Sequence, residues 1–176
     1  MISVLLLDGF SDDTVFFDGK TPKYICDIYL PLLEGVLRFN GISCERVLMS
    51  GFENEYSIRG KTNKNLIYLP IFTSSDKISS GISFIYTDST APDSVSFRIA
   101  SKLRRDGECV KHDEVVFVNS LHENDPLKRF SPIIVDNVRV AADGSNTDSL
   151  INTIYKRALC TAKSICEYYL PEFKKP

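Results

Sequence analysis

The chain alternates between short segments that are almost entirely apolar and longer segments whose apolar residues recur at helical spacing. Short apolar runs are typical of strands that are covered on both faces, as in a parallel sheet. The pattern predicts strands at residues 2–8, 42–49, 65–72, 81–87, 115–118 and 132–136. Helical spacing predicts helices within residues 22–40, from residue 93 or 94 to 106, and from residue 146 or 147 to about 169.

Two segments contain residues that interrupt a helix, the first predicted helix and the polar segment 51–64. Pro31 lies inside the first apolar repeat and removes a backbone donor, so we expect a kink or a helix that begins late, near residue 30. Gly41 follows the same repeat as a C-terminal stop. The segment 51–64 is polar and contains two glycines, which predicts a short or broken helix.

The order of these elements is β-α-β-(short α)-β-β-α-β-β-α. Strands that alternate with helices predict an α/β fold, here a three-layer sandwich with a mostly parallel central sheet of about six strands. The hydrophobic content of 43% and the charged content of 25% are ordinary for a globular protein. Because no shift in composition divides the chain, we expect a single domain over residues 1–176.

The charge of the chain argues against two classes of partner. The formal net charge is −2 and the pI is near 5.7, which give no general attraction to nucleic acid or to an anionic membrane. Since no run of about 20 apolar residues occurs, no transmembrane helix is expected. Residues 1–9 are apolar, but they lack a basic start and end in Asp8-Gly9. We expect a buried strand there, no signal peptide, and hence a cytoplasmic protein at synthesis.

The cysteines are odd in number and form no Cys-x-x-Cys pair, so a paired redox or metal motif is not predicted. The five are Cys26, Cys44, Cys109, Cys160 and Cys166. We expect buried, reduced thiols and a reducing compartment.

Three of the predicted strands follow one another in the order of the active-site strands of a known enzyme family. They read Ile-Ser-Val-Leu-Leu-Leu-Asp-Gly at 2–9, Leu-Ile-Tyr-Leu-Pro-Ile-Phe-Thr-Ser-Ser at 66–75 and Ser-Pro-Ile-Ile-Val-Asp-Asn at 131–137. In this order they resemble the zinc-dependent N-acetylmuramoyl-L-alanine amidases, which are cell-wall hydrolases. Residues 81–86 and 110–118 also resemble family segments, so the resemblance spans about residues 2–170. It implies the amidase fold.

The resemblance also implies where a zinc site would lie. In the family, two His and one Glu hold Zn²⁺, the metal lowers the pKa of a bound water, and a Glu on the last strand handles the proton. Ser11 or Phe10 stands at the first His position, and Phe72 stands at the second. The ligand Glu would fall within residues 22–24, which contain no acid, and Asp136 replaces the catalytic Glu. The frame of the family is thus kept while its three zinc ligands are absent.

A rearranged metal site made of carboxylates is an alternative. Asp8 and Asp12 lie at the end of the first strand, and α/β folds place their sites at the carboxyl ends of strands. Together with Asp136 they could hold Mg²⁺ or Ca²⁺, which prefer oxygen ligands. The plainer interpretation is a solvated acidic loop, because Asp is mostly exposed and Asp12-Asp13 lack the spacing of a calcium loop.

Two smaller charged features have a structural and a functional interpretation. His112 beside Asp113 could be a general base held by a carboxylate, but neighbours on a strand point apart, which favours a surface pair. Lys102, Arg104 and Arg105 form a short basic cluster. A favourable charge at a helix C-terminus explains this cluster more readily than contact with nucleic acid does.

The sequence therefore favours a non-catalytic, amidase-like protein that acts in binding or assembly. Because amidases of this family are common in bacteria and their phages, the resemblance implies a virion or assembly component, or a module that recognises peptidoglycan without cutting it. Protein partners or peptidoglycan are expected, with no nucleic acid, no membrane insertion and no cofactor. One alternative is a divergent metal-dependent peptidoglycan amidase that uses Asp136 with carboxylates near Asp8 and Asp12. Another is a different α/β fold with a small-ligand site at the strand ends.

Overall fold

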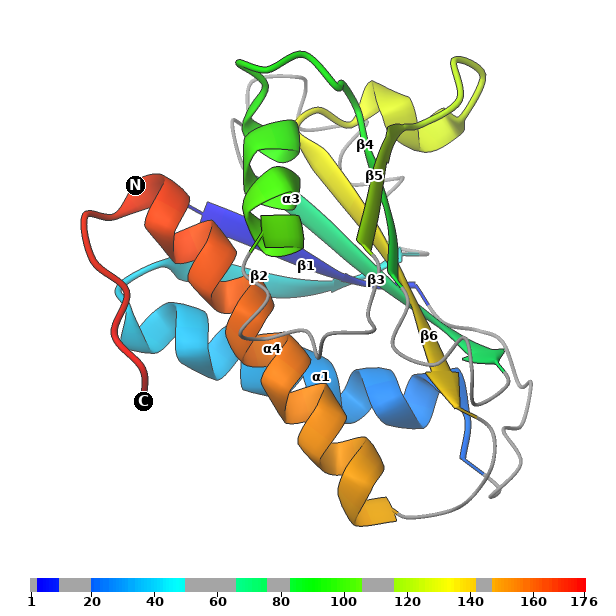
Figure 1. The fold of residues 1–176 in the computed structure, drawn as a ribbon, viewed down its shortest axis with the longest axis vertical. Coiled ribbons are helices and arrows are strands. Elements are labelled where there is room, and N and C mark those ends of the chain that lie inside the picture. Colours follow the sequence, from blue (N-terminus) through cyan, green and yellow to red (C-terminus); the bar gives the residue numbers. More distant parts are fainter. Residues whose placement is uncertain (1–2, 10–19, 50–65, 76–82, 106–115, 142–146) are drawn as a thin grey trace.

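The computed structural model describes residues 3–9, 20–49, 66–75, 83–105, 116–141 and 147–176 (Figure 1). In chain order the elements are β1 (Ser3–Asp8), α1 (Pro22–Phe39), β2 (Ser43–Leu48), β3 (Leu66–Ser75), β4 (Ser83–Thr87), α3 (Val95–Arg105), β5 (Val116–Ser120), the 3-10 helix η1 (Pro126–Arg129), β6 (Ile133–Ala141) and α4 (Thr147–Tyr169). Strands thus alternate with helices along most of the described chain.

The strands form one six-stranded sheet in the order β2-β1-β3-β6-β4-β5. All neighbouring strands run parallel except β4 and β6, which are antiparallel. In the centre of the sheet, Leu6 pairs with Tyr68, and Pro70 pairs with Asp136. The predicted α/β class, with a mostly parallel central sheet of six strands, is confirmed.

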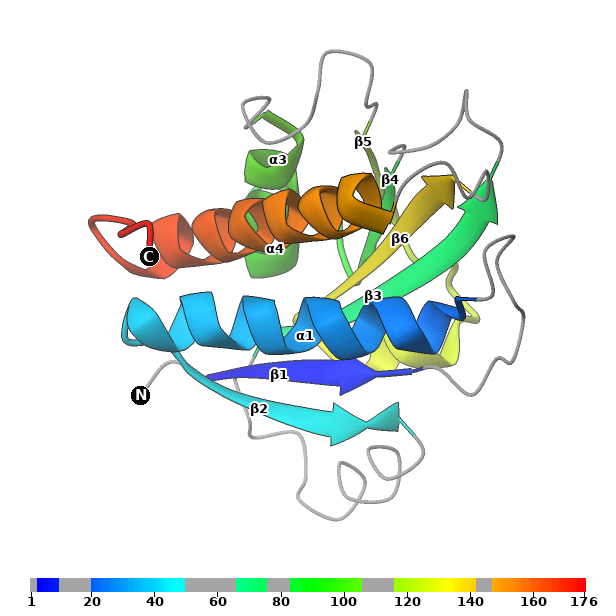
Figure 2. The same ribbon diagram turned by 90° about the horizontal axis from the view of Figure 1, so that it is seen from below.

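The helices α1, α3 and α4 all pack on one face of this sheet (Figures 1 and 2). Side chains such as Leu6 and Tyr68 point to that face and form the larger core with the helices. The opposite face contributes Leu7 and Ile67 to a smaller core, which Phe130 beside η1 helps to cover. Within the parts of the chain that the structure describes, none of the helices is both long enough and apolar enough to cross a bilayer.

Helix α1 begins at Pro22, so the prediction of a late start near residue 30 is wrong. Thr21 caps the helix by accepting a 3.1 Å hydrogen bond from the backbone of Tyr24, and Pro22 occupies a position where no N–H is needed. Pro31 lies inside the helix and is exposed. Its cost of about 3 kcal/mol is offset because the helix buries a long apolar face. That face consists of Ile25, Cys26, Tyr29, Leu30, Leu33, Val36 and Leu37.

Local sequence signals determine the end of α1 and the start of α3, whereas pairing with a neighbouring strand determines the end of β6. Gly41 follows α1 with a φ of 83°, which confirms the predicted C-terminal stop. Ser94 caps α3 by accepting a 3.1 Å hydrogen bond from the backbone N–H of Phe97. Strand β6 extends beyond its predicted end, as far as Ala141, because it pairs with β3 along its whole length. The short helix predicted within residues 51–64 lies outside the described residues.

The cysteines differ in their chemical state. Cys26, Cys44 and Cys166 are free and buried, as predicted for reduced thiols. Cys160 is disulfide-bonded, so the prediction of a reduced thiol is wrong at this position. Sequence spacing could not reveal the bond, because a disulfide depends on two Cα atoms lying within about 7 Å of each other in space.

Candidate functional site

A buried ion pair joins the last strand to the last helix. Asp136 of β6 points to the helical face of the sheet and is 0% exposed. Arg157 of α4 donates from Nη2 to both carboxylate oxygens, at 2.7 Å to Oδ1 and 2.8 Å to Oδ2. A buried charge is costly unless it is paired and hydrogen-bonded, so each of these residues requires the other.

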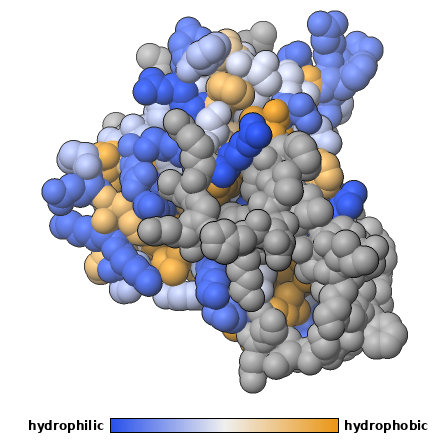
Figure 3. Space-filling model, in the orientation of Figure 1, coloured by the Kyte–Doolittle hydropathy of each residue, from blue (hydrophilic) through white to orange (hydrophobic). Residues whose placement is uncertain are grey.

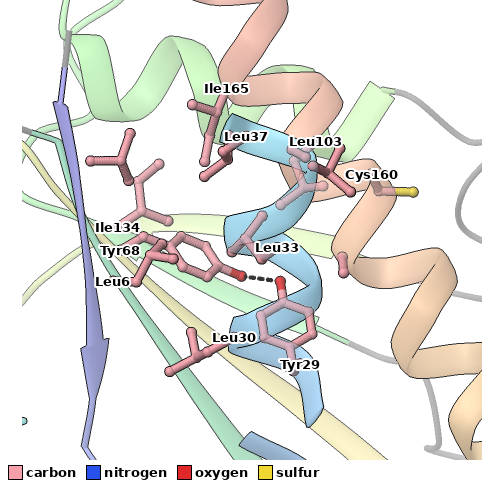
Figure 4. Close-up of a cluster of buried hydrophobic side chains, with 14 of the residues drawn as sticks. Leu6, Tyr29, Leu30, Leu33, Leu37, Tyr68, Leu103, Ile134, Cys160 and Ile165 are labelled. Atoms are coloured by element: carbon pink, nitrogen blue, oxygen red, sulfur yellow. Dashed lines mark hydrogen bonds between the residues drawn. The ribbon is translucent and has the colours of Figure 1, made fainter. Parts of the chain in front are cut away.

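Hydroxyl groups extend this ion pair into a network that links the sheet to α1 and α4. Tyr68 of β3 donates to Oδ2 of Asp136 at 2.6 Å. The hydroxyl of Tyr29 on α1 lies 2.8 Å from that of Tyr68 and 2.9 Å from Oγ1 of Thr161 on α4. Figure 4 shows the two tyrosine hydroxyls pointing toward each other among aliphatic side chains. The network therefore connects two elements of the first half of the chain, α1 and β3, with two of the second half, β6 and α4.

Burial sets the protonation of the network. Burial raises the pKa of Tyr68 well above its usual value, and the negative charge of Asp136 raises it further. The same two causes, in the same order, raise the pKa of Tyr29. Burial acts to lower the pKa of Arg157, but the attraction of Asp136 and the two tyrosines outweighs it, so the pKa is raised overall. The tyrosines are thus neutral, and Arg157 is charged, over the ordinary pH range.

This arrangement encloses the carboxylate of Asp136. A general base must reach the proton that it removes, directly or through one water. Asp136 has no exposed surface, and both of its oxygens accept hydrogen bonds from the protein. In this conformation the group acts as a buried link between strands and helices.

Phe72 is also part of the core. It is 2% exposed, and its ring packs against Tyr29 in an edge-on contact with centroids 5.3 Å apart and planes at 74°. A phenyl ring has no donor atom that binds a metal ion. At this position of β3 the chain therefore contributes packing against α1.

Asp8, at the end of β1, faces a cation on the first turn of α1. Its Oδ2 lies 3.7 Å from Nζ of Lys23, and the same ammonium lies 2.8 Å from Oδ1 of Asp27. The hydrogen bond with Asp27 is the largest cause of the raised pKa of Lys23, and the charge of Asp8 adds to it. Lys23 falls within residues 22–24, where the amidase resemblance implies a ligand Glu. An ammonium thus lies between two carboxylates at this end of the sheet.

The other carboxylate oxygen of Asp8, Oδ1, is buried beside α1. It meets no donor at good hydrogen-bond geometry among the described residues, although the thiol of Cys26 is close enough to interact with it. The thiol of Cys26, one turn into α1, is nearby, and burial followed by the charge of Asp8 raises the pKa of that thiol to about 12. Cys26 is therefore protonated at neutral pH and is a poor nucleophile or metal ligand.

The predicted carboxylate cluster does not bring Asp8 and Asp136 together. Their strands flank β3, which separates the two positions by two strand spacings, roughly 10 Å. Each carboxylate faces its own cation, Lys23 or Arg157. Asp12 and Ser11, the other two residues considered for a metal site, lie outside the described residues.

The described residues do not fit a zinc ion. Phe72 offers no ligand atom, Asp136 is held by Arg157, and Asp8 faces an ammonium. Across the described ranges, no three His, Cys, Asp or Glu side chains are grouped so that they could hold a metal ion.

The remaining candidates are remote from this region or fall outside it. His122 is exposed and accepts a long hydrogen bond of 3.4 Å from the backbone of Asn124. Lys102 pairs with Glu167 of α4 at 3.3 Å. His112 and Asp113 lie outside the described residues.

Sequence reasoning missed Arg157, although a signal was present. The residue falls on the apolar stripe of α4, between Ile154 and Ala158, which are both buried. A charge on the inner face of a helix requires a partner in the core. Asp136 is the matching charge on a strand that faces the same core.

Comparisons with known proteins give the fold. No protein-family model matches the sequence, and no curated protein sequence matches it. Among solved structures, N-acetylmuramoyl-L-alanine amidase AmiC2 of Nostoc punctiforme is similar, with 13% identity, a TM-score of 0.67, and coverage of 95% of this chain and 96% of that chain. The chain has the N-acetylmuramoyl-L-alanine amidase fold.

Two further amidase structures agree. The CwlD amidase from Clostridioides difficile, solved in complex with the GerS lipoprotein, has 13% identity and a TM-score of 0.67, with coverage of 96% and 98% of the two chains. The catalytic domain of CwlV, an N-acetylmuramoyl-L-alanine amidase from Bacillus (Paenibacillus) polymyxa var. colistinus, has 17% identity and a TM-score of 0.62, with the same coverage. The amidase fold extends over nearly the whole chain.

Proposed function

We propose that this protein is a non-catalytic, amidase-fold protein that binds peptidoglycan without hydrolysing it. The observation that carries the proposal is the enclosure of Asp136 by Arg157 and Tyr68. In the resemblance to the amidases, Asp136 stands in place of the residue that handles the proton. A carboxylate that is sealed in the core and paired with a guanidinium has no access to a substrate.

The charge near the end of β1 supports the same proposal. Nζ of Lys23 brings a positive charge between Asp8 and Asp27, within the residues where the resemblance to the amidases implies a zinc ligand. A positive charge there balances the carboxylates without a metal and repels a divalent cation. The fold can thus be retained while metal-assisted hydrolysis is lost.

A protein partner is a further part of the proposal. The CwlD amidase, which shares the fold, was solved in complex with the GerS lipoprotein. That complex supports the idea that a surface of the amidase fold serves protein binding. A partner that brings this chain to the cell wall would be compatible with peptidoglycan recognition.

One observation favours a hydrolase with a rearranged site instead. Oδ1 of Asp8 is a buried acceptor at the end of a strand that none of the described residues fully satisfies, and such a group favours binding of a ligand or an ion. In this alternative, Asp8 binds a metal with carboxylates such as Asp12, and Lys23 moves away. The substrate would be the peptidoglycan amide bond.

One set of assays separates the two proposals. Purified protein is analysed for metal content and then incubated with purified peptidoglycan sacculi, with and without added Zn²⁺, to measure co-sedimentation and muropeptide release. We expect co-sedimentation, no bound metal and no release. Asp8→Asn is the informative variant, and Glu172→Gln, at an exposed acid near the C-terminus, is its matched control.

Each outcome has a definite meaning. Muropeptide release that Asp8→Asn abolishes and Glu172→Gln retains would overturn the non-catalytic proposal in favour of the hydrolase. An absence of both co-sedimentation and release would overturn peptidoglycan binding. Co-sedimentation without release, unchanged in both variants, supports the leading proposal.

A further inference from the structure

Helix α3 carries an open hollow that is separate from the strand ends described above. Its volume is about 500 Å³, and its lining residues are Pro92, Phe97, Arg98, Ser101, Lys102 and Arg104. Strand β4 is antiparallel to β6, so the C-terminal end of β4 lies beside the N-terminal end of β6. Helix α3, which follows β4, therefore begins on the side of the sheet away from the C-terminal end of β6. Figures 1 and 2 show α3 beside the C-terminal half of α4. Metal or amide chemistry at the end of β1 would not involve this hollow.

The lining of the hollow is strongly basic. Its described residues include three cations, of which Lys102 pairs with Glu167 of α4 at 3.3 Å, and Glu167 also lies 3.8 Å from Lys163. Arg98 and Arg104 form no ion pair with any carboxylate in the described part of the chain, and both are exposed. The hollow therefore has a net positive charge, although the chain as a whole carries −2.

The helix dipole does not explain all of these charges. Cations are favourable in the last turn of a helix, which accounts for Arg104. Arg98 lies in the first turn, where a positive charge is unfavourable. Its guanidinium lies over the ring of Tyr168, 5.3 Å from the ring centroid. This contact holds the guanidinium at the hollow, and a guanidinium presents planar, paired donors that match phosphate or carboxylate oxygens.

Apolar surface completes the hollow. Phe97 and Pro92 form a non-polar wall beside the cations. Figure 3 shows that hydrophilic and hydrophobic residues are interspersed over the described surface on this side of the molecule. The volume falls within the range of about 300–1,000 Å³ that is usual for small-molecule sites, although the lining is more basic than the mostly apolar lining of such sites. The size and lining suit a compact ligand with one charged group and one less polar face.

We propose that the α3 hollow, formed by Phe97, Arg98, Lys102 and Arg104, binds a phosphorylated sugar or polyol. In this proposal the phosphate accepts hydrogen bonds from the guanidinium groups of Arg98 and Arg104, which suit a dianion, while Lys102 remains paired with Glu167 at the side of the hollow. The carbon skeleton of the ligand packs on the ring of Phe97. Nucleic acid is a poorer fit, because its binding uses a longer basic track with several stacking aromatic side chains.

The test is calorimetric titration of the full chain with glycerol 1-phosphate and with glucose 6-phosphate at low ionic strength. Glucose, an acidic peptide and vesicles of phosphatidylglycerol in phosphatidylcholine are the comparison probes. We expect saturable binding of at least one soluble phosphate compound, with much weaker binding of glucose and the peptide. Higher salt should weaken binding, because the groups involved are exposed.

Variants locate the site. Arg98→Gln/Arg104→Gln should weaken binding by about tenfold or more, because it removes two charge-assisted contacts. Lys156→Gln/Lys175→Gln changes the net charge equally at exposed residues elsewhere and should leave affinity within about twofold. Arg104→Gln alone should also weaken binding, and it avoids the contact of Arg98 with Tyr168. Folding of each variant is checked by circular dichroism.

Several results would overturn the proposal. They are the absence of saturable binding of both phosphate compounds, equal affinity for glucose or the peptide, binding to the vesicles alone, and equal weakening in the control pair. The titration contains no peptidoglycan, so its result is independent of whether the proposed peptidoglycan binding is correct.

Discussion

Arg157 contacts both oxygens of Asp136 through a single nitrogen, Nη2, at 2.7 and 2.8 Å. Nε of the same guanidinium is buried and has no hydrogen-bond partner in the part of the chain that the structure describes. The pair therefore differs from the two-nitrogen fork in which arginine usually holds a carboxylate. Tyr68 supplies the second donor to Asp136. The ion pair and the tyrosine thus depend on one another, which makes the network sensitive to single substitutions.

Removing one member of the ion pair should destabilise the protein strongly. Arg157→Met leaves the carboxylate of Asp136 buried and without its cation, which should lower the free energy of unfolding by about 3–5 kcal/mol. The double variant Asp136→Asn/Arg157→Met should lose less than the sum of the two single variants. Urea denaturation of all four proteins measures the difference. Strictly additive losses would contradict the coupling.

Tyr29 and Tyr68 should ionise only when the protein unfolds. Burial raises both pKa values, so the neutral form stabilises the fold at pH values below about 10, the ordinary pKa of tyrosine. Above that pH the unfolded chain loses protons that the folded chain keeps, and stability should fall as pH rises. Absorbance at 295 nm during alkaline titration should show these groups titrating together with loss of circular dichroism.

A variant at Tyr68 provides the control for that titration. Tyr68→Phe should remove one late-titrating group and lower the free energy of unfolding by about 1–3 kcal/mol, because Oδ2 of Asp136 loses a donor. Tyr24→Phe, at an exposed position, should leave stability unchanged within about 0.5 kcal/mol. Titration of all tyrosines below the unfolding transition would show that the network opens more easily than its burial indicates.

Lys23 should control metal binding at the end of β1. Lys23→Glu replaces the ammonium between Asp8 and Asp27 with a third carboxylate, so this variant should be less stable without divalent cations. Added Mn²⁺ or Zn²⁺ should raise its melting temperature, because a ligand that binds only the folded state stabilises it. The wild-type protein should show no comparable shift. An equal shift in the wild type would favour the hydrolase alternative.

Asn40 should control the order of the C-terminal segment. Its amide donates from Nδ2 to the carbonyl of Lys174 at 2.9 Å and accepts from the backbone N–H of Lys174 at 2.7 Å, in the manner of a strand pair. Asn40→Ala should speed hydrogen exchange at residue 174 and lower the free energy of unfolding by about 1 kcal/mol. Lys175→Ala is the control. Unchanged exchange in Asn40→Ala would show that other contacts hold the segment.

The thiol count tests the disulfide at Cys160. One disulfide among the five cysteines leaves three thiols that react in denaturant without reductant, and five after reduction. Cys26, Cys44 and Cys166 are buried, so they should react slowly in the native protein. Five reactive thiols without reductant would contradict the bond.

The sequence alone determined most of the architecture, because strands and helices arise from local backbone bonding and from the period of apolar residues. The strand predicted at 65–72 and the stop at Gly41 were interpretable without tertiary contacts. The start of α1 was not interpretable in this way. The helix-breaking tendency of Pro31 conflicted with capping by Thr21 and with the burial of a long apolar face, and the capped, buried helix is the one that forms.

Tertiary structure decided the role of Asp136. The resemblance placed this residue on the correct strand, but its chemistry depends on Arg157, 21 residues later, and on Tyr68, 68 residues earlier. Neither partner is set by local pattern, because the pairing exists only once α4 packs against the sheet. Because a buried charge is costly unless it is paired, the carboxylate of Asp136 and the guanidinium of Arg157 are stable in that interface only as an ion pair. Periodicity thus predicts which face a residue occupies, whereas the partner that a buried charge meets is determined by the packing of elements remote in sequence.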